Sequence, residues 1–194
     1  DMFINYAKQY SDMPFVIMLD EDENGYKAGR FLRASDLGMS GENNEWKPVI
    51  QDKLSQQLLV PNGTMGQRWE EGKKWNLKLE TEDGTPIDPM LSMAESDYHV
   101  ETIQFPYFDS SGDGIFERPI ATRTIQLANG EEVKIATVYD LMTSQYGVQR
   151  FEHELEATSY DDASSKYTPA WQEQITGIKK ELVTRSEERR VGKE

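Results

Sequence analysis

The chain has 194 residues, enough for one domain with a buried core, and a formal net charge of −14. Such acidity argues against nucleic acids and anionic membranes as partners, because proteins bind both through basic patches. The chain contains no cysteine, which excludes disulfides, thiolate metal sites and cysteine-held iron–sulfur clusters within it. We find no signal peptide and no apolar run of about 18 residues, so we expect no direct membrane insertion.

The first segment carries apolar residues at helical spacing, namely Phe3, Tyr6, Ala7 and Tyr10. No N-cap precedes them, so we expect that the chain begins inside a helix whose start has been cut off. A continuous apolar run at 13–19 then predicts a buried strand.

A hairpin is predicted next, because Asn24-Gly25 has the chemistry of a tight turn and the strand would return over 26–32. Four acidic residues at 20–23 precede this turn. Paired carboxylates can act as acid and base when one of them is desolvated. Consecutive acids at a turn are more often hydrated, so we interpret them as a solvated tip.

The middle of the chain is rich in turns, with a short strand predicted at 46–50. The segment 74–80 alternates, which would place Trp75, Leu77 and Leu79 on one face of a strand. Asn62-Gly63-Thr64 matches the glycosylation acceptor pattern, but three-residue motifs are common by chance.

The second half contains clearer signals. We expect 100–108 to be extended, and strands at 122–127 and 132–136 flank Asn129-Gly130, the strongest hairpin signal in the chain. Thr137 is a suitable cap for a helix over 138–146.

A further helix is predicted after Thr168, with Pro169 at its first position and Gly177 at its end. Trp171 and Ile175, four residues apart, would form its buried stripe.

Several patterns suggest sites, and we favour a structural interpretation of each. The segment 109–114 matches the first half of a calcium loop, but Ile120 occupies the place of the bidentate glutamate, after Pro119. We expect a solvated turn there. His99 and His153 have no ligand partners at metal-binding spacing and are interpreted as structural histidines.

The remaining candidates are treated in the same way. Asp161 and Asp162 suggest a turn or cap before the Thr168 helix. The tryptophans could form a carbohydrate platform, but each lies in an apolar pattern and is expected in the core: Trp46, Trp69, Trp75 and Trp171. No nucleophile elbow, phosphate loop or dinucleotide motif is present.

The segment 157–177 carries the most specific pattern. It contains Tyr167-Thr168-Pro169-x-Trp171, followed by Ile175-Thr176-Gly177. It resembles a signature of the catalytic α subunit of the membrane-bound respiratory nitrate reductases, which are molybdopterin oxidoreductases. Further blocks resemble the same subunit in the same order along the chain: 10–19, 25–36, 60–69, 74–77, 105–108 and 137–141.

The resemblance implies an internal piece of an α/β protein, locally mixed α+β, in which a hairpin- and loop-rich insert is flanked by helices. Residues 1–184 would be part of a molybdopterin oxidoreductase domain, truncated at both ends. Residues 185–194 have no apolar period, and we expect that they do not continue the helix that opens at 179–183. They resemble a translated sequencing adapter and are interpreted as a non-native tail. A natural charged terminus is the alternative.

The resemblance also implies a function. The parent subunit would reduce nitrate to nitrite at molybdenum held by two molybdopterin guanine dinucleotides, with electrons from quinol. A 4Fe-4S cluster would relay electrons, and an iron–sulfur β subunit and a membrane haem-b γ subunit would be partners at the cytoplasmic face of the membrane. The ligands of both cofactors would lie outside this chain, so we assign no catalytic, cofactor-binding or metal residue and expect the chain alone to be inactive.

Two alternatives remain. The parent could be a related molybdoenzyme, such as a chlorate or selenate reductase or a formate dehydrogenase. The chain could instead be a free-standing, acidic, β-rich module that binds calcium.

Overall fold

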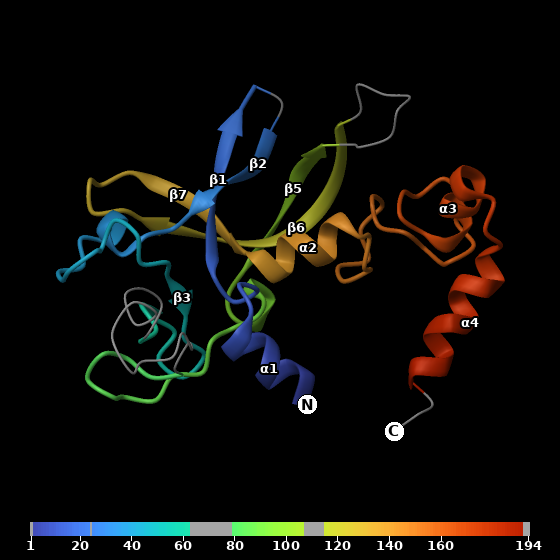
Figure 1. Ribbon diagram of the computed structural model, residues 1–194. Helices are drawn as coiled ribbons and strands as arrows, with labels where there is room; N and C mark the ends of the chain where they lie inside the picture. The colour runs from blue at the N-terminus through green and yellow to red at the C-terminus, as the bar shows by residue number, and fades with distance from the viewer. Residues whose placement is uncertain (1, 24, 63–78, 107–114, 192–194) are drawn as a thin grey trace. The chain divides into compact units, whose positions relative to one another are not determined.

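A computed structural model describes residues 2–23, 25–62, 79–106 and 115–191 (Figure 1). The chain has a mixed α+β fold and divides into two compact units. Unit 1 comprises Asp1–Gln104 and Ile120–Leu141, and unit 2 comprises Phe105–Pro119 and Met142–Glu194. Each unit is described by itself.

The largest element is a closed five-stranded barrel with the strand order β1-β2-β5-β6-β7 (Figure 1). Its strands are β1 (Val16–Asp22), β2 (Gly25–Phe31), β5 (His99–Pro106), β6 (Ile115–Gln126) and β7 (Glu132–Thr137). The pairs β1/β2, β1/β7 and β6/β7 are antiparallel. The β1/β7 pairing joins the β1/β2 and β6/β7 hairpins, and a short parallel pairing of β2 with β5 at Tyr26 and Ile103 connects the first hairpin to β5.

The first predicted hairpin is confirmed as β1 and β2. A bulge lies between Ile17 and Leu19, so Gly29 lies close to the opposite strand. A Cβ atom on Gly29 would be 2.6 Å from Asp20 Oδ1 and 2.7 Å from the Met18 carbonyl oxygen. This contact explains why glycine occupies that position.

The second predicted hairpin is confirmed as β6 and β7. Gly130 has a φ of 88°, and the Asn129 side chain accepts a hydrogen bond from Glu131 N at 3.0 Å. β6 begins earlier than the strand expected at 122–127. It includes Pro119, although proline disfavours the interior of a strand. Ile120 next to it is fully buried.

The core of unit 1 combines barrel residues with side chains from the loops. The largest fully buried apolar side chains are Leu32, Ile50, Met90, Met93, Ile103, Ile120 and Ile135. The short strand expected at 46–50 lies slightly later, as β3 (Ile50–Gln51), and pairs with β4 (Leu58–Leu59). Two short 3-10 helices, η1 (Ala34–Leu37) and η3 (Met93–Glu95), complete the unit.

One core prediction for the tryptophans is wrong. Trp46 is 57% exposed, because it lies in the turn before β3, where its carbonyl oxygen accepts a hydrogen bond from Arg33 Nη1 at 2.6 Å. Trp69 and Trp75 lie outside the described residues, as does most of the strand expected at 74–80.

The helices α1 (Met2–Tyr10) and α2 (Val138–Gln145) occur where they were predicted. Thr137 caps α2, since its Oγ1 accepts a hydrogen bond from Asp140 N at 3.0 Å. Lys8 holds α1 to unit 1 through an ion pair with Asp88 at 2.5 Å.

Unit 2 contains α3 (Pro169–Thr176) and α4 (Lys180–Val191). The buried stripe expected on α3 is wrong at Ile175, which is 56% exposed. Ala170 is the buried residue of α3, and Trp171 is half-buried. The prediction that 185–194 would not continue a helix is also wrong. Arg and Glu are good helix formers, so this segment extends α4 to Val191 without an apolar stripe.

Candidate functional site

The start of α3 shows how the signature segment folds. Thr168 is in an extended conformation, and its hydroxyl oxygen accepts a hydrogen bond from Trp171 N at 3.1 Å. The same hydroxyl donates to the Asp162 carbonyl oxygen at 2.7 Å. At the other end, Gly177 has a φ of 71° and donates to the Glu173 carbonyl oxygen. The predicted N-cap, first-position proline and terminal glycine are therefore confirmed.

The loop before α3 is held by a side-chain turn. Asp162 Oδ1 accepts hydrogen bonds from Ser164 N at 3.0 Å, Ser165 N at 3.3 Å and Ser164 Oγ at 2.6 Å. The bond from Ser164 is the main reason why the pKa of Asp162 is lowered. Asp161 forms an ion pair with Lys180 at 2.6 Å. The interpretation of the two aspartates as turn residues is confirmed.

Arg118 of β6 ties this loop together from inside. It is 7% exposed, and its Nη1 donates to the Leu155 carbonyl oxygen at 2.8 Å. Its Nη2 donates to the Lys166 carbonyl oxygen at 3.3 Å and to Ser165 Oγ at 3.4 Å. The guanidinium also lies over the Phe116 ring at 5.2 Å. One buried side chain thus connects both ends of the segment 155–166.

The charge of Arg118 is poorly compensated. Burial lowers the pKa of Arg118, and the charges of Tyr167, Asp162 and Glu156, at longer range, act to raise it. Arg118 Nε is buried and has no hydrogen-bond partner within the described residues. Arginine stays protonated in proteins. Its contacts with carbonyl oxygens and an aromatic ring therefore stabilise a positive charge that no carboxylate touches in the described part of the chain.

An aromatic cluster surrounds Tyr167. Its ring lies 5.2 Å from Trp171, 5.5 Å from Phe116 and 6.1 Å from Tyr146, in edge-to-face geometries. Tyr167 adopts a φ of 69°, which is uncommon for a non-glycine residue. Burial raises the pKa of the Tyr167 hydroxyl, Tyr146 adds to this effect and Arg118 opposes it. The packing of the ring compensates for the strained backbone.

A pocket of about 530 Å³ opens beside this cluster, within unit 2. Aromatic, hydroxyl and amide side chains line it, including Tyr146, Tyr160, Tyr167, Thr168 and Gln172. None of its described lining residues is charged. The pocket can therefore hold a neutral group by stacking and hydrogen bonding, and its described lining includes no His, Cys, Asp, Glu or Lys.

The sequence did not predict the structural roles of Arg118 and Glu156, nor that Tyr167 would be the centre of an aromatic cluster. Glu156 is 7% exposed, and its carboxylate accepts backbone hydrogen bonds from Arg150 at 2.7 Å, His153 at 3.0 Å and Phe151 at 3.1 Å. These roles depend on distant partners. The only available signal was a charged residue between apolar neighbours, as at Glu156 between Leu155 and Ala157.

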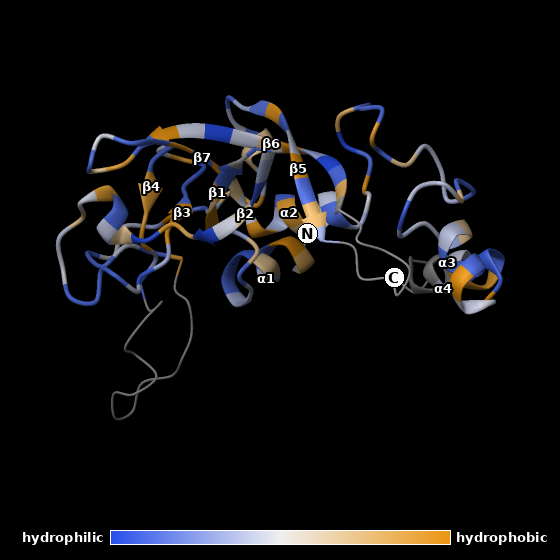
Figure 2. Cartoon of the chain, turned by 90° about the horizontal axis from the view of Figure 1, so that it is seen from above, coloured by the Kyte–Doolittle hydropathy of each residue, from blue (hydrophilic) through white to orange (hydrophobic). Residues whose placement is uncertain are grey.

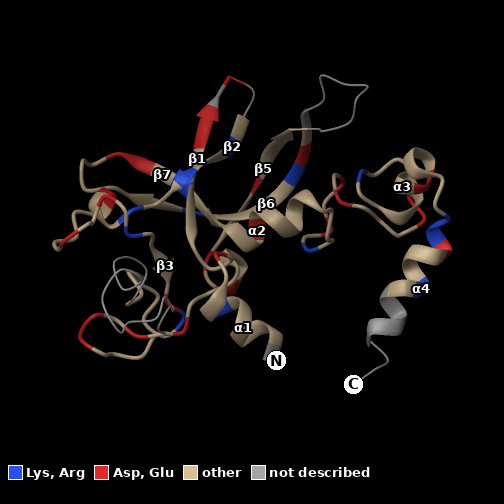
Figure 3. Ribbon diagram, in the orientation of Figure 1, with Lys and Arg blue, Asp and Glu red and all other residues tan. Residues whose placement is uncertain are grey.

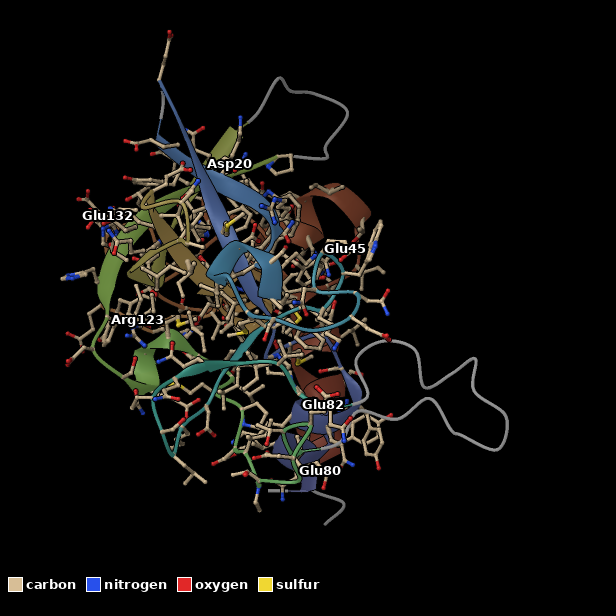
Figure 4. All side chains as sticks on the ribbon, turned by 90° about the vertical axis from the view of Figure 1, so that its left-hand side faces the viewer. Asp20, Glu45, Glu80, Glu82, Arg123 and Glu132 are labelled. Carbon is tan, nitrogen blue, oxygen red and sulfur yellow. The ribbon has the colours of Figure 1, made fainter. Side chains whose placement is uncertain are left out.

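A second recess, of about 840 Å³, lies in unit 1 beside both hairpins. Asp20 of β1 and Glu132 of β7, both labelled in Figure 4, line it. Exposed Asp20, Glu21 and Glu23 confirm the solvated tip, and the outer half of β1 is red in Figure 3. Arg30, which also lines the recess, makes two hydrogen bonds of 2.7 Å to Asp36, and they lower the pKa of Asp36.

The remaining candidates are dispersed. His99 is exposed on β5, and His153 Nδ1 accepts a hydrogen bond from Leu155 N at 3.2 Å. No group of three potential metal ligands occurs among the described residues. Asn62 donates to the Glu80 carbonyl oxygen at 2.8 Å through its backbone. The half calcium loop at 109–114 lies outside the described residues.

Comparison with known proteins identifies the relationship. No protein-family profile matches the chain. It is 45% identical over 95% of its length to the nitrate reductase alpha chain of Bacillus subtilis. It is 38% identical over 94% to the respiratory nitrate reductase 1 alpha chain of Escherichia coli, and 36% over 91% to a nitrate reductase alpha subunit of Mycobacterium tuberculosis. The chain spans 15%, 16% and 14% of these relatives, respectively. The chain is therefore homologous to a segment of the respiratory nitrate reductase α subunit.

Proposed function

We propose that the chain is a structural part of a respiratory nitrate reductase α subunit, whose complete enzyme reduces nitrate to nitrite with electrons from quinol. The 45% identity over nearly the whole chain carries this proposal. The signature segment 157–177 forms a packed, capped loop and helix around Arg118 and Tyr167 rather than a catalytic centre. In this role the chain supports the body of the enzyme.

The cofactors of such an enzyme would be molybdenum bis(molybdopterin guanine dinucleotide) and a 4Fe-4S cluster. The chain does not fit either metal centre, because it has no cysteine and its described residues contain no cluster of metal ligands. The uncharged tyrosine pocket offers no metal ligand either. We therefore place the metal ligands in other parts of the parent subunit and derive no reaction step from this chain.

The proposal extends to assembly. The parent subunit would join an iron–sulfur β subunit and a haem-b γ subunit at the cytoplasmic face of the membrane. Among the described helices, none is both long and apolar enough to cross a bilayer. The net charge of −14 also disfavours direct binding to anionic lipid.

The test is to sequence the DNA that flanks this reading frame in its source and to express the complete enzyme. We expect an upstream frame that encodes a cysteine-containing cluster motif, and faster turnover of nitrate than of chlorate, selenate or formate with a viologen dye. Preference for one of the other three would favour the related molybdoenzyme. An initiator methionine and signal peptide just before Asp1 would contradict the proposal.

The calcium-binding alternative has its own test. Calorimetric titration of the chain with CaCl₂ should show no binding in the micromolar range, because the twelfth position of the half loop is Ile120. Micromolar binding that disappears in Asp113→Ala would support a calcium module instead.

A further inference from the structure

Helix α1 presents an aromatic stripe that the other described residues of unit 1 do not cover. Phe3 is 73% exposed, Tyr6 60% and Tyr10 51%. At about 100° per residue, these three positions fall on one narrow side of the helix. The rings of Tyr6 and Tyr10 lie 5.1 Å apart, so the stripe is already organised.

Other residues of α1 hold the helix to unit 1. Ala7 is 2% exposed and Lys8 is 8% exposed. The Lys8 ammonium pairs with Asp88, and Ser11 Oγ donates to the Ala7 carbonyl oxygen at 2.6 Å, just beyond the helix end. The helix is therefore held by one side, and the aromatic stripe lies beside that side.

The stripe carries no charge. Lys8 is the only charged residue in the sequence of α1, and it is used in the ion pair. Figure 3 accordingly shows α1 as mostly tan, and parts of it are orange in Figure 2. In a chain in which 29% of residues are charged, a solvated helix face would carry acids or lysines. A cluster of aromatic side chains that is exposed in this chain is typical of a surface that another segment or protein covers.

The size of the stripe indicates what covers it. At about 200 Å² for each fully exposed aromatic side chain, the three rings offer roughly 370 Å². A standard stable interface needs about 800 Å² from each partner. A second copy of the chain would therefore gain too little area from this stripe to offset the entropy lost on association. A segment of the same polypeptide loses no translational and rotational entropy of association, so a patch of this size is sufficient for a contact inside a subunit.

We propose that the aromatic stripe of α1 is an internal contact of the parent α subunit, covered by an uncharged, apolar segment of that polypeptide outside this chain. This inference rests on the proposed function, and the relatives supply the required length, since the chain spans only 15% of the Bacillus subtilis α chain. The uncharged face selects a partner surface without carboxylates or lysines at the contact, because each would be buried without a counter-charge.

The experiment places this chain in the Bacillus subtilis α chain in place of the matching segment, with p-benzoylphenylalanine at the position of Tyr6. After irradiation of the assembled enzyme, we expect cross-links to apolar peptides of the same α chain outside the matched segment. The same photoreactive residue at Asn5, which is exposed away from the stripe, is the matched control and should give several-fold fewer of these cross-links. Cross-links to another subunit, between two copies or to nothing would overturn the inference. Nitrate reduction by the chimera reports separately on the proposed function.

Two further measurements use the 194-residue chain by itself, so they do not depend on the chimera. By sedimentation at tens of micromolar, the chain and its Phe3→Ser, Tyr6→Ser, Tyr10→Ser variant should have the same mass. An oligomer that the triple substitution disperses would identify a second copy as the occupant and overturn the inference. Overlapping peptides of the Bacillus subtilis α chain should include uncharged apolar segments that bind the chain and not the variant. Absence of such peptides would also overturn it.

Discussion

The carboxylate of Asp140 at the start of α2 accepts a hydrogen bond of 2.6 Å from the hydroxyl of Ser92, 48 residues earlier in the chain. Asp140 is fully buried and also accepts hydrogen bonds from Met93 N at 2.8 Å and Thr137 Oγ1 at 2.9 Å. The single hydroxyl proton of Thr137 is shared between this carboxylate and the Leu91 carbonyl oxygen, which lies 2.6 Å from Oγ1. A single side chain thus joins the end of β7 to η3 in unit 1.

Replacing Asp140 by alanine should therefore destabilise the chain strongly. The substitution leaves buried donors of Ser92 and Met93 without an acceptor, and each such group costs about 1–3 kcal/mol. We expect a loss of roughly 3 kcal/mol in the free energy of unfolding, measured by urea denaturation and circular dichroism. Glu132→Ala, at an exposed position of β7, is the control and should change stability by less than about 0.5 kcal/mol. Equal effects of the two substitutions would show that the Asp140 network contributes little.

The N-cap of α3 gives a local prediction. Thr168→Ala removes the acceptor for Trp171 N, so we expect a loss of about 1 kcal/mol and faster hydrogen exchange in the first turn of α3. Thr176→Ala is the matched control, since among the described residues its hydroxyl makes hydrogen bonds only with Gln172 and with Ile178 N, on the exposed side. Unchanged exchange at Trp171 in Thr168→Ala would contradict the capping role.

The Arg30–Asp36 ion pair predicts that the folded chain loses part of its stability at acidic pH. The bond from Arg30 lowers the pKa of Asp36 in the folded chain. The contribution of this pair to stability is therefore present above the pKa of an unfolded aspartate, about 3.9, and is lost as the pH falls through the lower pKa of Asp36 in the folded chain. Arg30 is largely exposed, so the effect should be below about 1 kcal/mol.

Urea midpoints between neutral and acidic pH test this prediction. Arg30→Met should be less stable than the parent above pH ~4 and converge with it at lower pH. Glu45→Gln, at an exposed position labelled in Figure 4, should leave the pH profile unchanged. A constant difference between Arg30→Met and the parent at every pH would assign its effect to packing.

The last residues give a further prediction. Deleting 185–194 should leave the melting temperature unchanged within error, because Arg185 and Ser186 are exposed and exposed termini tolerate truncation. Deleting 180–194 should lower the melting temperature. It removes the ion pair of Lys180 with Asp161 and the hydrogen bond of 3.0 Å that the Lys180 backbone N–H donates to the Glu173 carboxylate. A marked decrease with the shorter deletion would show that 185–194 is structural.

The chain alone should not reduce nitrate. It lacks cysteine, and its described residues provide no cluster of metal ligands, so reduced-viologen assays with the purified chain should show no turnover above buffer. Molybdenum content measured on the same sample should stay far below one atom per chain. Turnover by the chain itself would contradict the interpretation that its role is structural.

The sequence by itself determined the features that depend on neighbours within a few residues. Asn129-Gly130 specifies its hairpin because the turn needs positive φ, and Gly130 has a φ of 88°. Thr168 and Gly177 specify the ends of α3 because their hydrogen-bond partners lie within one helical turn. The α-subunit relationship was also visible in the sequence, because collinear motifs do not depend on knowing the fold.

Only the tertiary structure decided features whose partners are distant in the chain. The parallel pairing of β2 with β5 joins Tyr26 to Ile103, and nothing local to either strand indicates it. Arg118 finds Leu155 and Lys166, 37 and 48 residues away, and this pairing explains its burial. Periodicity shows which residues of a helix share a face, but what packs on that face determines burial, so Ile175 is exposed although the sequence pattern predicted it in the core.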